Sequence, residues 1–182
     1  MRKKWPLAIA ALALAGCSTA TQTAAPAASQ PADASTPAAA SQAPSNQFKV
    51  GQAGHVTGDA GLDATVTLVS LKFYAAPKDT TMGSAPANGQ FAVADVLISV
   101  KAGSYDYNPL YFKYQASDAT TYDTMSGNAD LAGFDPSLSS GTLTAGQKTR
   151  GFITWDVPKG KTGVDVQLAD PIGSILGQWN VG

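Results

Sequence analysis

The sequence predicts an all-β fold, an antiparallel β-sandwich of about seven to eight strands. Short segments alternate between apolar and polar residues, and no apolar pattern of helical period runs for the length of a helix. All thirteen acidic residues are Asp and none is Glu. Asp favours turns, whereas Glu is a good helix former. Frequent Gly, Thr, Val and Tyr also favour turns and strands.

The first long predicted strand, residues 62–73, changes its apolar phase halfway. Apolar side chains occupy the even positions from Leu62 to Leu68 and then the odd positions from Val69 to Phe73. A β-bulge produces such a change, because one extra residue moves the following side chains to the other face. Residues 91–100 are apolar on both faces apart from two positions, which predicts a central strand.

Four further segments show apolar residues at the spacing of a half-buried strand. They are residues 110–115, 153–157, 164–168 and 175–181. In the second of these, we expect Ile153, Trp155 and Val157 to point into the core. Thr154 and Asp156 would then face outward.

Turn residues separate these strands. Asn88–Gly89 predicts a turn before residues 91–100, and Pro158–Gly163 predicts a hairpin connection. The linkers over residues 75–87 and 123–140 are long for a small domain. Loops of that length are often where a module makes its contacts.

The first sixteen residues have the pattern of an export signal. Met1–Lys4 is basic, and Trp5–Ala15 is an apolar run too short to span a bilayer. The run ends in Leu-Ala-Gly16-Cys17, which resembles the bacterial lipobox. That resemblance implies cleavage after Gly16 and lipidation of Cys17. The alternative is an ordinary signal peptide with cleavage near Ala15 and an incidental cysteine.

Residues 17–46 join the lipidated cysteine to the domain that we place at 47–182. From Ser18 to Asn46 the chain holds only Ala, Ser, Thr, Pro, Gln, one Asp and one Asn. Such a segment cannot bury enough apolar surface to offset the entropy of ordering, which predicts a disordered tether. A flexible coil of this length reaches roughly 30 Å.

The charge balance excludes two kinds of partner. Without the leader, nine basic residues face thirteen Asp, so the mature chain is mildly acidic. No basic run remains, which argues against nucleic acid and against electrostatic docking on anionic lipid. We therefore expect attachment to the bacterial cell membrane through the lipid anchor alone.

A series of motifs resembles a known family. In chain order, the motifs cover residues 89–96, 108–112, 121–123, 143–152 and 157–160. Together they resemble the DUF4352 domains of Gram-positive and actinobacterial lipoproteins, over roughly Val50 to Val181. The resemblance implies an immunoglobulin-like sandwich, similar to that of a secreted mycobacterial antigen, and supplies no catalytic residues.

The residues themselves give no catalytic constellation. His55 is the only histidine, and the Gly-x-Ser-x-Gly pattern of a serine nucleophile is absent. Cys17 would be occupied by lipid, and one histidine cannot form a zinc site. We predict a non-enzymatic protein without a cofactor. A hydrolase would require His55 to lie in a cleft beside a Ser and an Asp.

Two groups of residues are candidates for a binding site. One is a tyrosine surface for an envelope protein or glycan, made of Tyr105, Tyr107, Tyr111 and Tyr122. Core or sheet packing is the alternative role for these aromatic side chains. The other is a calcium or small-ligand site in the loops, made of Asp118, Asp123, Asp130 and Asp135. Carboxylates that shape turns are the alternative there.

These observations predict a lipid-anchored, extracytoplasmic protein that displays a binding module at the cell envelope. The alternative is a lipoprotein that binds calcium or a small ligand through the aspartate-containing loops.

Overall fold

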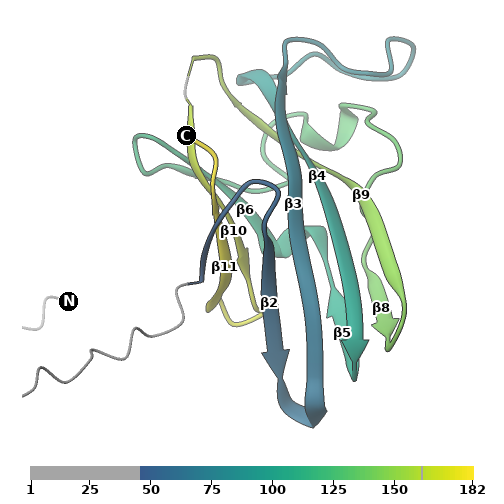
Figure 1. The fold of residues 1–182 in the computed structure, drawn as a ribbon. Helices are drawn as coiled ribbons and strands as arrows, with labels where there is room; N and C mark the ends of the chain where they lie inside the picture. The colour runs from purple at the N-terminus through teal and green to yellow at the C-terminus, as the bar shows by residue number, and fades with distance from the viewer. Residues whose placement is uncertain (1–45, 161) are drawn as a thin grey trace, which may run out of the picture. The chain divides into compact units, whose positions relative to one another are not determined.

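The computed structural model describes residues 46–160 and 162–182, which form two facing sheets (Figure 1). The predicted leader over residues 1–16, Cys17 and the tether up to residue 45 lie outside the described residues. The first sheet has the order β1 (Gln47–Lys49), β11 (Ile175–Asn180), β10 (Gly163–Ala169), β6 (Phe112–Ala116) and β7 (Thr121–Tyr122). The second has the order β2 (Ala53–Gly58), β3 (Leu62–Tyr74), β4 (Gly89–Ala102) and β9 (Lys148–Pro158).

Shorter elements complete the fold. A two-stranded sheet pairs β5 (Ser104–Tyr107) with β8 (Gly141–Thr144). Three 3₁₀ turns lie at η1 (Asp59–Gly61), η2 (Pro109–Tyr111) and η3 (Ala129–Leu131). Among the described residues, no helix is long and apolar enough to cross a membrane.

The core lies between the two sheets and is built from the strand faces that the alternation predicts. Ile153, Trp155 and Val157 of β9 are buried, as expected. The indole Nε1–H of Trp155 donates to the carbonyl of Phe112 at 3.3 Å, so one side chain links the two sheets. The Trp155 ring also lies 6.0 Å from that of Tyr114, centroid to centroid. The predicted sandwich is therefore confirmed.

The predicted bulge in β3 is confirmed as well. The register between β3 and β4 shifts between Leu68 and Ser70, at the point where the apolar pattern changes phase. After the shift, Leu71 packs against the core and the ring of Phe73 contacts that of Tyr114. The extra residue keeps apolar side chains on the inner face of a thirteen-residue strand.

The predicted hairpin over Pro158–Gly163 is wrong. β9 pairs with β4 in one sheet, whereas β10 pairs with β6 and β11 in the other. The connection therefore crosses between the sheets. Turn-forming residues mark a reversal of the chain, but they do not determine whether the next strand pairs with the previous one.

The two lateral edges of the sandwich differ. At one edge, β2 lies against β1 and β11, and the described chain begins there at Asn46. β1 is parallel to β11, and Gln178 donates its backbone N–H to the Asn46 carbonyl at 2.8 Å. At the other edge, β7 contacts β9. The long loop over residues 123–140 joins the fold at this second edge.

Candidate functional site

One buried carboxylate joins both long loops to β9. Asp156 is fully buried, and its two oxygens accept three backbone N–H groups. Ala87 and Asn88 donate from the loop over residues 75–88, at 2.6 Å and 2.9 Å. Asn128 donates from the loop over residues 123–140, at 2.8 Å. A buried carboxylate needs such partners, and here they come from two segments distant in sequence.

A glycine allows the second loop to approach this carboxylate. Gly127 has φ +59°, and a Cβ at this position would overlap the carboxylate of Asp156. The side-chain amide of Asn128, the next residue, donates to the Ala85 carbonyl at 2.7 Å. The two loops are thus bound to each other as well as to Asp156.

The loops also cover the outer face of the β4–β9 sheet. A second apolar cluster forms there, separate from the main core, from Phe91, Val93, Ala132, Phe134 and Phe152. Burial of these apolar side chains holds the 123–140 loop on the sheet.

The same loop binds the outer edge of β9. Phe152 donates its backbone N–H to the Pro136 carbonyl at 2.8 Å, and its carbonyl accepts the Leu138 N–H at 2.9 Å. Ser137 therefore forms an isolated parallel bridge with Phe152. These hydrogen bonds hold the C-terminal part of the loop beside β9, an edge strand.

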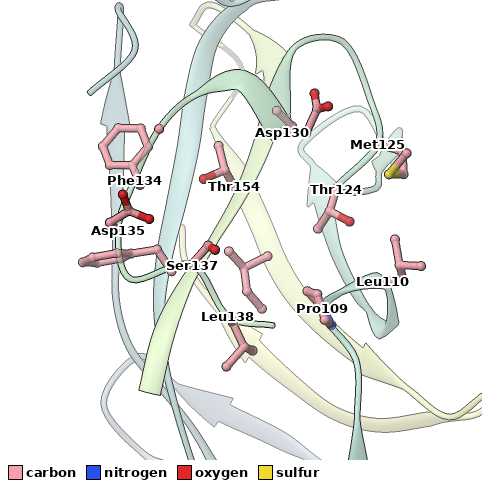
Figure 2. A pocket seen from close by; sticks show the side chains of 14 residues that line it. Pro109, Leu110, Thr124, Met125, Asp130, Phe134, Asp135, Ser137, Leu138 and Thr154 are labelled. Carbon is pink, nitrogen blue, oxygen red and sulfur yellow. The ribbon is translucent and has the colours of Figure 1, made fainter. Parts of the chain in front are cut away.

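Between the loop, η2 and β9 lies a pocket of about 360 Å³. Figure 2 shows Leu110 and Met125 on one side and Phe134 and Asp135 on the other, with Thr154 of β9 between them. The Leu110 and Met125 side chains are 44% and 70% exposed, so apolar surface is open to solvent here. The volume is near the lower end of the range for ligand sites.

A capped turn places Leu110 at the pocket. The side chain of Asn108 accepts the Leu110 N–H at 2.9 Å, and Pro109 begins the 3₁₀ turn. The strand that the sequence predicts from residue 110 therefore starts only at Phe112. Leu110 is released from the strand and faces solvent at the rim instead of the core.

The four candidate tyrosines do not gather on an open surface. Tyr105 is buried, and burial, together with the nearby Tyr111, raises the pKa of its hydroxyl to about 12. Tyr107, Tyr111 and Tyr122 are half-buried and pack against the main core. None of the four lines the pocket. Their arrangement agrees with the alternative role in core and sheet packing.

The four candidate aspartates lie in different surroundings. Within residues 46–160 and 162–182, no group of three or more His, Cys, Asp or Glu side chains could hold a metal ion. Asp118 accepts the Thr120 N–H at 3.2 Å in its own turn. Asp130 and Asp135 line the pocket.

Asp123 also serves its own turn. Its carboxylate accepts the Met125 N–H at 2.9 Å and the Ser126 hydroxyl at 3.0 Å. Partial burial raises the pKa of Asp123, but these hydrogen bonds outweigh it and hold the pKa below its ordinary value. The alternative interpretation, carboxylates that shape turns, describes Asp118 and Asp123.

His55 lies exposed on β2 and does not line the pocket. The sequence reasoning identified the two long loops but missed Asp156, which was expected to face solvent. One signal was available: Asp is depleted in strands, so an Asp between Trp155 and Val157 needs a structural reason. Thr154 and Met125 gave no comparable signal.

Comparison with known proteins extends the motif resemblance. A family model described as "Domain of unknown function (DUF4352)" matches residues 51–175, which confirms the resemblance. No curated protein matches the chain.

Three solved structures are similar at low sequence identity. The secreted protein MPT63 of Mycobacterium tuberculosis is 19% identical, covers 74% of this chain and 95% of its own, and gives a TM-score of 0.55. The yjhA protein of Bacillus subtilis is 19% identical over 63% of this chain and 76% of its own, with a TM-score of 0.44. The putative lipoprotein ycdA of Bacillus subtilis is 14% identical over 71% of this chain and 39% of its own, with a TM-score of 0.47. The likeness to MPT63 is one of fold, an immunoglobulin-like β-sandwich.

Proposed function

Since the chain belongs to the DUF4352 family, we propose that it is an exported, lipid-anchored binding protein that presents the β9 pocket at the cell envelope. The leader and Cys17 support export and anchoring. MPT63, which shares the fold, is itself described as a secreted protein.

The Asp156 network is the observation that supports a binding role most directly. The protein places a carboxylate in its interior and uses it to hold two long loops around one pocket. Most of the side chains that the loops pack on the sheet belong to the second apolar cluster, on the face opposite the main core. The fold therefore keeps a shaped surface, which is what recognition requires.

The pocket chemistry favours binding over catalysis. Its ionisable side chains are Asp130 and Asp135, and both are exposed. The remaining lining is apolar or hydroxyl-bearing, with Leu110, Met125 and Phe134 as its large apolar side chains. Apolar walls with a few polar groups are typical of ligand sites.

The position of the pocket fits display from a membrane. The described chain begins at Asn46, beside β1, whereas the pocket lies next to β9 at the opposite edge of the sandwich. A tether joined at Asn46 would therefore leave the pocket accessible to partners.

Anchoring is tested by growing cells with radiolabelled palmitate. The wild-type chain should incorporate label, and Cys17→Ala should incorporate none and leave the membrane fraction. Equal labelling of both chains would rule out the anchor at Cys17.

Binding is tested with a photoreactive amino acid at Met125 in the full chain, in living cells. The matched control carries the same group at Met82, which is 82% exposed and does not line the pocket. A defined adduct at 125 and none at 82 supports the proposal. Equal labelling at both positions, or none at either, contradicts it. The adduct's mass separates a protein partner from a small ligand.

A further inference from the structure

Thr154 lies on β9 beside the pocket. β9 is the edge strand of its sheet, and Phe152 directs its N–H and C=O away from β4, toward Pro136 and Leu138. In an antiparallel ladder, residues two apart point the same way. Thr154 therefore points its N–H and C=O outward as well. Within the part of the chain that the structure describes, no backbone group bonds to them.

The outward N–H and C=O of Thr154 form a site at which another extended chain can pair with β9. Unpaired N–H and C=O groups at a strand edge accept the backbone of an extended chain. The neighbouring position of this edge is already used in that way, because Ser137 forms a parallel bridge with Phe152. At Thr154 the loop no longer follows the strand, and the pocket opens instead.

Resting on the proposed binding function, we propose that the pocket receives an extended peptide segment of another protein, which pairs with β9 at Thr154. Two backbone hydrogen bonds hold the peptide, one from the Thr154 N–H and one to its carbonyl. An apolar side chain of the peptide then packs against Leu110 and Met125, whose exposed surfaces lie beside the strand (Figure 2).

The negative charge of the pocket predicts a second feature of the peptide, a basic residue. Asp130 and Asp135 are exposed and line the pocket, and no basic residue lines it. A Lys or Arg next to the apolar residue of the peptide would meet these carboxylates. The expected ligand is an extended segment with one large apolar side chain and a basic neighbour.

The chain's own N-terminal segment does not have this composition. Residues 18–45 contain no Lys or Arg and no apolar side chain larger than Pro. The described chain also begins at the opposite edge of the sandwich, beside β1. The ligand is therefore assigned to a different protein.

The test starts from a library of random linear dodecapeptides displayed on phage, selected on the full chain purified in detergent. We expect enriched peptides with a large apolar residue and an adjacent Lys or Arg. Thr154→Pro removes the outward N–H and should weaken the selected peptides by about tenfold.

Thr57→Pro is the matched control. Leu68 of β3 faces β2, because its carbonyl accepts the Gly51 N–H. By alternation, the backbone N–H and C=O of Asp63 point toward β4. The backbone groups of its partner Thr57 therefore point away from β3, to the open edge of β2, which is far from the pocket. Proline is tolerated at such edge positions. Thr57→Pro should leave peptide binding unchanged.

A second measurement does not depend on how well Thr154→Pro folds. Methylation of the backbone nitrogens of a selected peptide, at alternate positions, removes its donors without changing its side chains. One of the two methylation patterns should weaken binding to the wild-type chain by about tenfold, and the other should not.

The outcomes separate this inference from the proposed function. The inference is overturned if no peptide is enriched. It is also overturned if binding is weakened neither by Thr154→Pro nor by either methylation pattern. The proposed function still stands in that case when the photoreactive group at Met125 gives its defined adduct. Loss of that adduct contradicts the proposed function itself.

Discussion

The backbone N–H of Asn128 lies 2.8 Å from Oδ2 of Asp156, although Asn128 is in a surface loop and Asp156 lies near the C-terminal end of β9. The same oxygen accepts the Ala87 N–H, and the other accepts the Asn88 N–H. Asp156 does not line the pocket. The pocket therefore depends on a residue that a ligand would not touch.

Asp156→Asn should lower the free energy of unfolding by about 3 kcal/mol. The amide would offer one accepting oxygen and an NH₂ group where three backbone donors converge, so donors would face donors. Urea denaturation followed by tryptophan fluorescence measures the change.

Asp106→Asn is the control for this substitution. Asp106 is exposed, and its carboxylate accepts the Thr142 hydroxyl at 2.6 Å. Its replacement should change the stability by less than about 0.5 kcal/mol. Equal losses in the two variants would mean that the Asp156 network does not stabilise the fold.

Gly127→Ala should destabilise the protein more than Gly146→Ala. Both glycines have positive φ, +59° and +83°, so each substitution carries a backbone cost of about 1 kcal/mol. Only the Cβ at 127 meets the Asp156 carboxylate, whereas nothing lies within 4 Å at 146. The difference between the melting temperatures of the two variants measures the cost of the contact between the Cβ at 127 and the Asp156 carboxylate. Equal melting temperatures would show that this contact costs nothing.

Phe134→Ala should lower the free energy of unfolding by about 3 kcal/mol. Phe134 is 9% exposed and its ring lies 4.6 Å from that of Tyr74. Met125→Ala, in the same loop at 70% exposure, should cost less than about 0.5 kcal/mol. Hydrogen exchange should show faster exchange at residues 129–138 in Phe134→Ala alone. Unchanged protection there would mean that the second apolar cluster does not hold the loop.

Alkaline pH should unfold the protein through two buried tyrosines. Burial, with nearby Tyr111 and Tyr122 respectively, raises the pKa of Tyr105 and Tyr114 to about 12. The unfolded chain loses these protons near the ordinary tyrosine pKa of about 10, so the stabilising effect is complete below that pH. It is lost as pH rises through 12, by up to about 1.4 kcal/mol per pH unit for each tyrosine.

The measurement is urea denaturation at a series of pH values above 9. Tyr105→Phe should flatten the fall in stability with pH, because one of the two titrating groups is then absent. If the free energy of unfolding falls equally steeply with pH in wild type and variant, Tyr105 does not contribute to the loss of stability at alkaline pH.

The strand pattern predicted the core because burial on one face imposes a period of two. Alternation placed Trp155 in the core, where it is buried. The change of apolar phase after Leu68 predicted the register shift at that point of β3. β2 and β8 escaped prediction because their Gly- and Thr-rich segments contain few apolar residues. Pairing between sheets also escaped prediction, since turn residues at Pro158–Gly163 fit a crossover as well as a hairpin.

The site was predictable only in part. The length of the 123–140 linker directed attention to the loop whose Asp130 and Asp135 line the pocket. Alternation placed Asp156 outward correctly, but the loops that bury it there come from distant segments. A period of two specifies a face and says nothing about what covers it.

The parallel pairing of β1 with β11 has a mechanical consequence. If a membrane tether joined at Asn46 is pulled, the tension enters the domain through three residues of β1. Release of this short strand would lengthen the tether while the β2–β3–β4–β9 sheet stays paired. Phe48 resists the release, because its ring packs 5.5 Å from that of Trp179. Under such tension we expect β1, which is held by its pairing with β11 and by this ring contact, to be the first strand to detach.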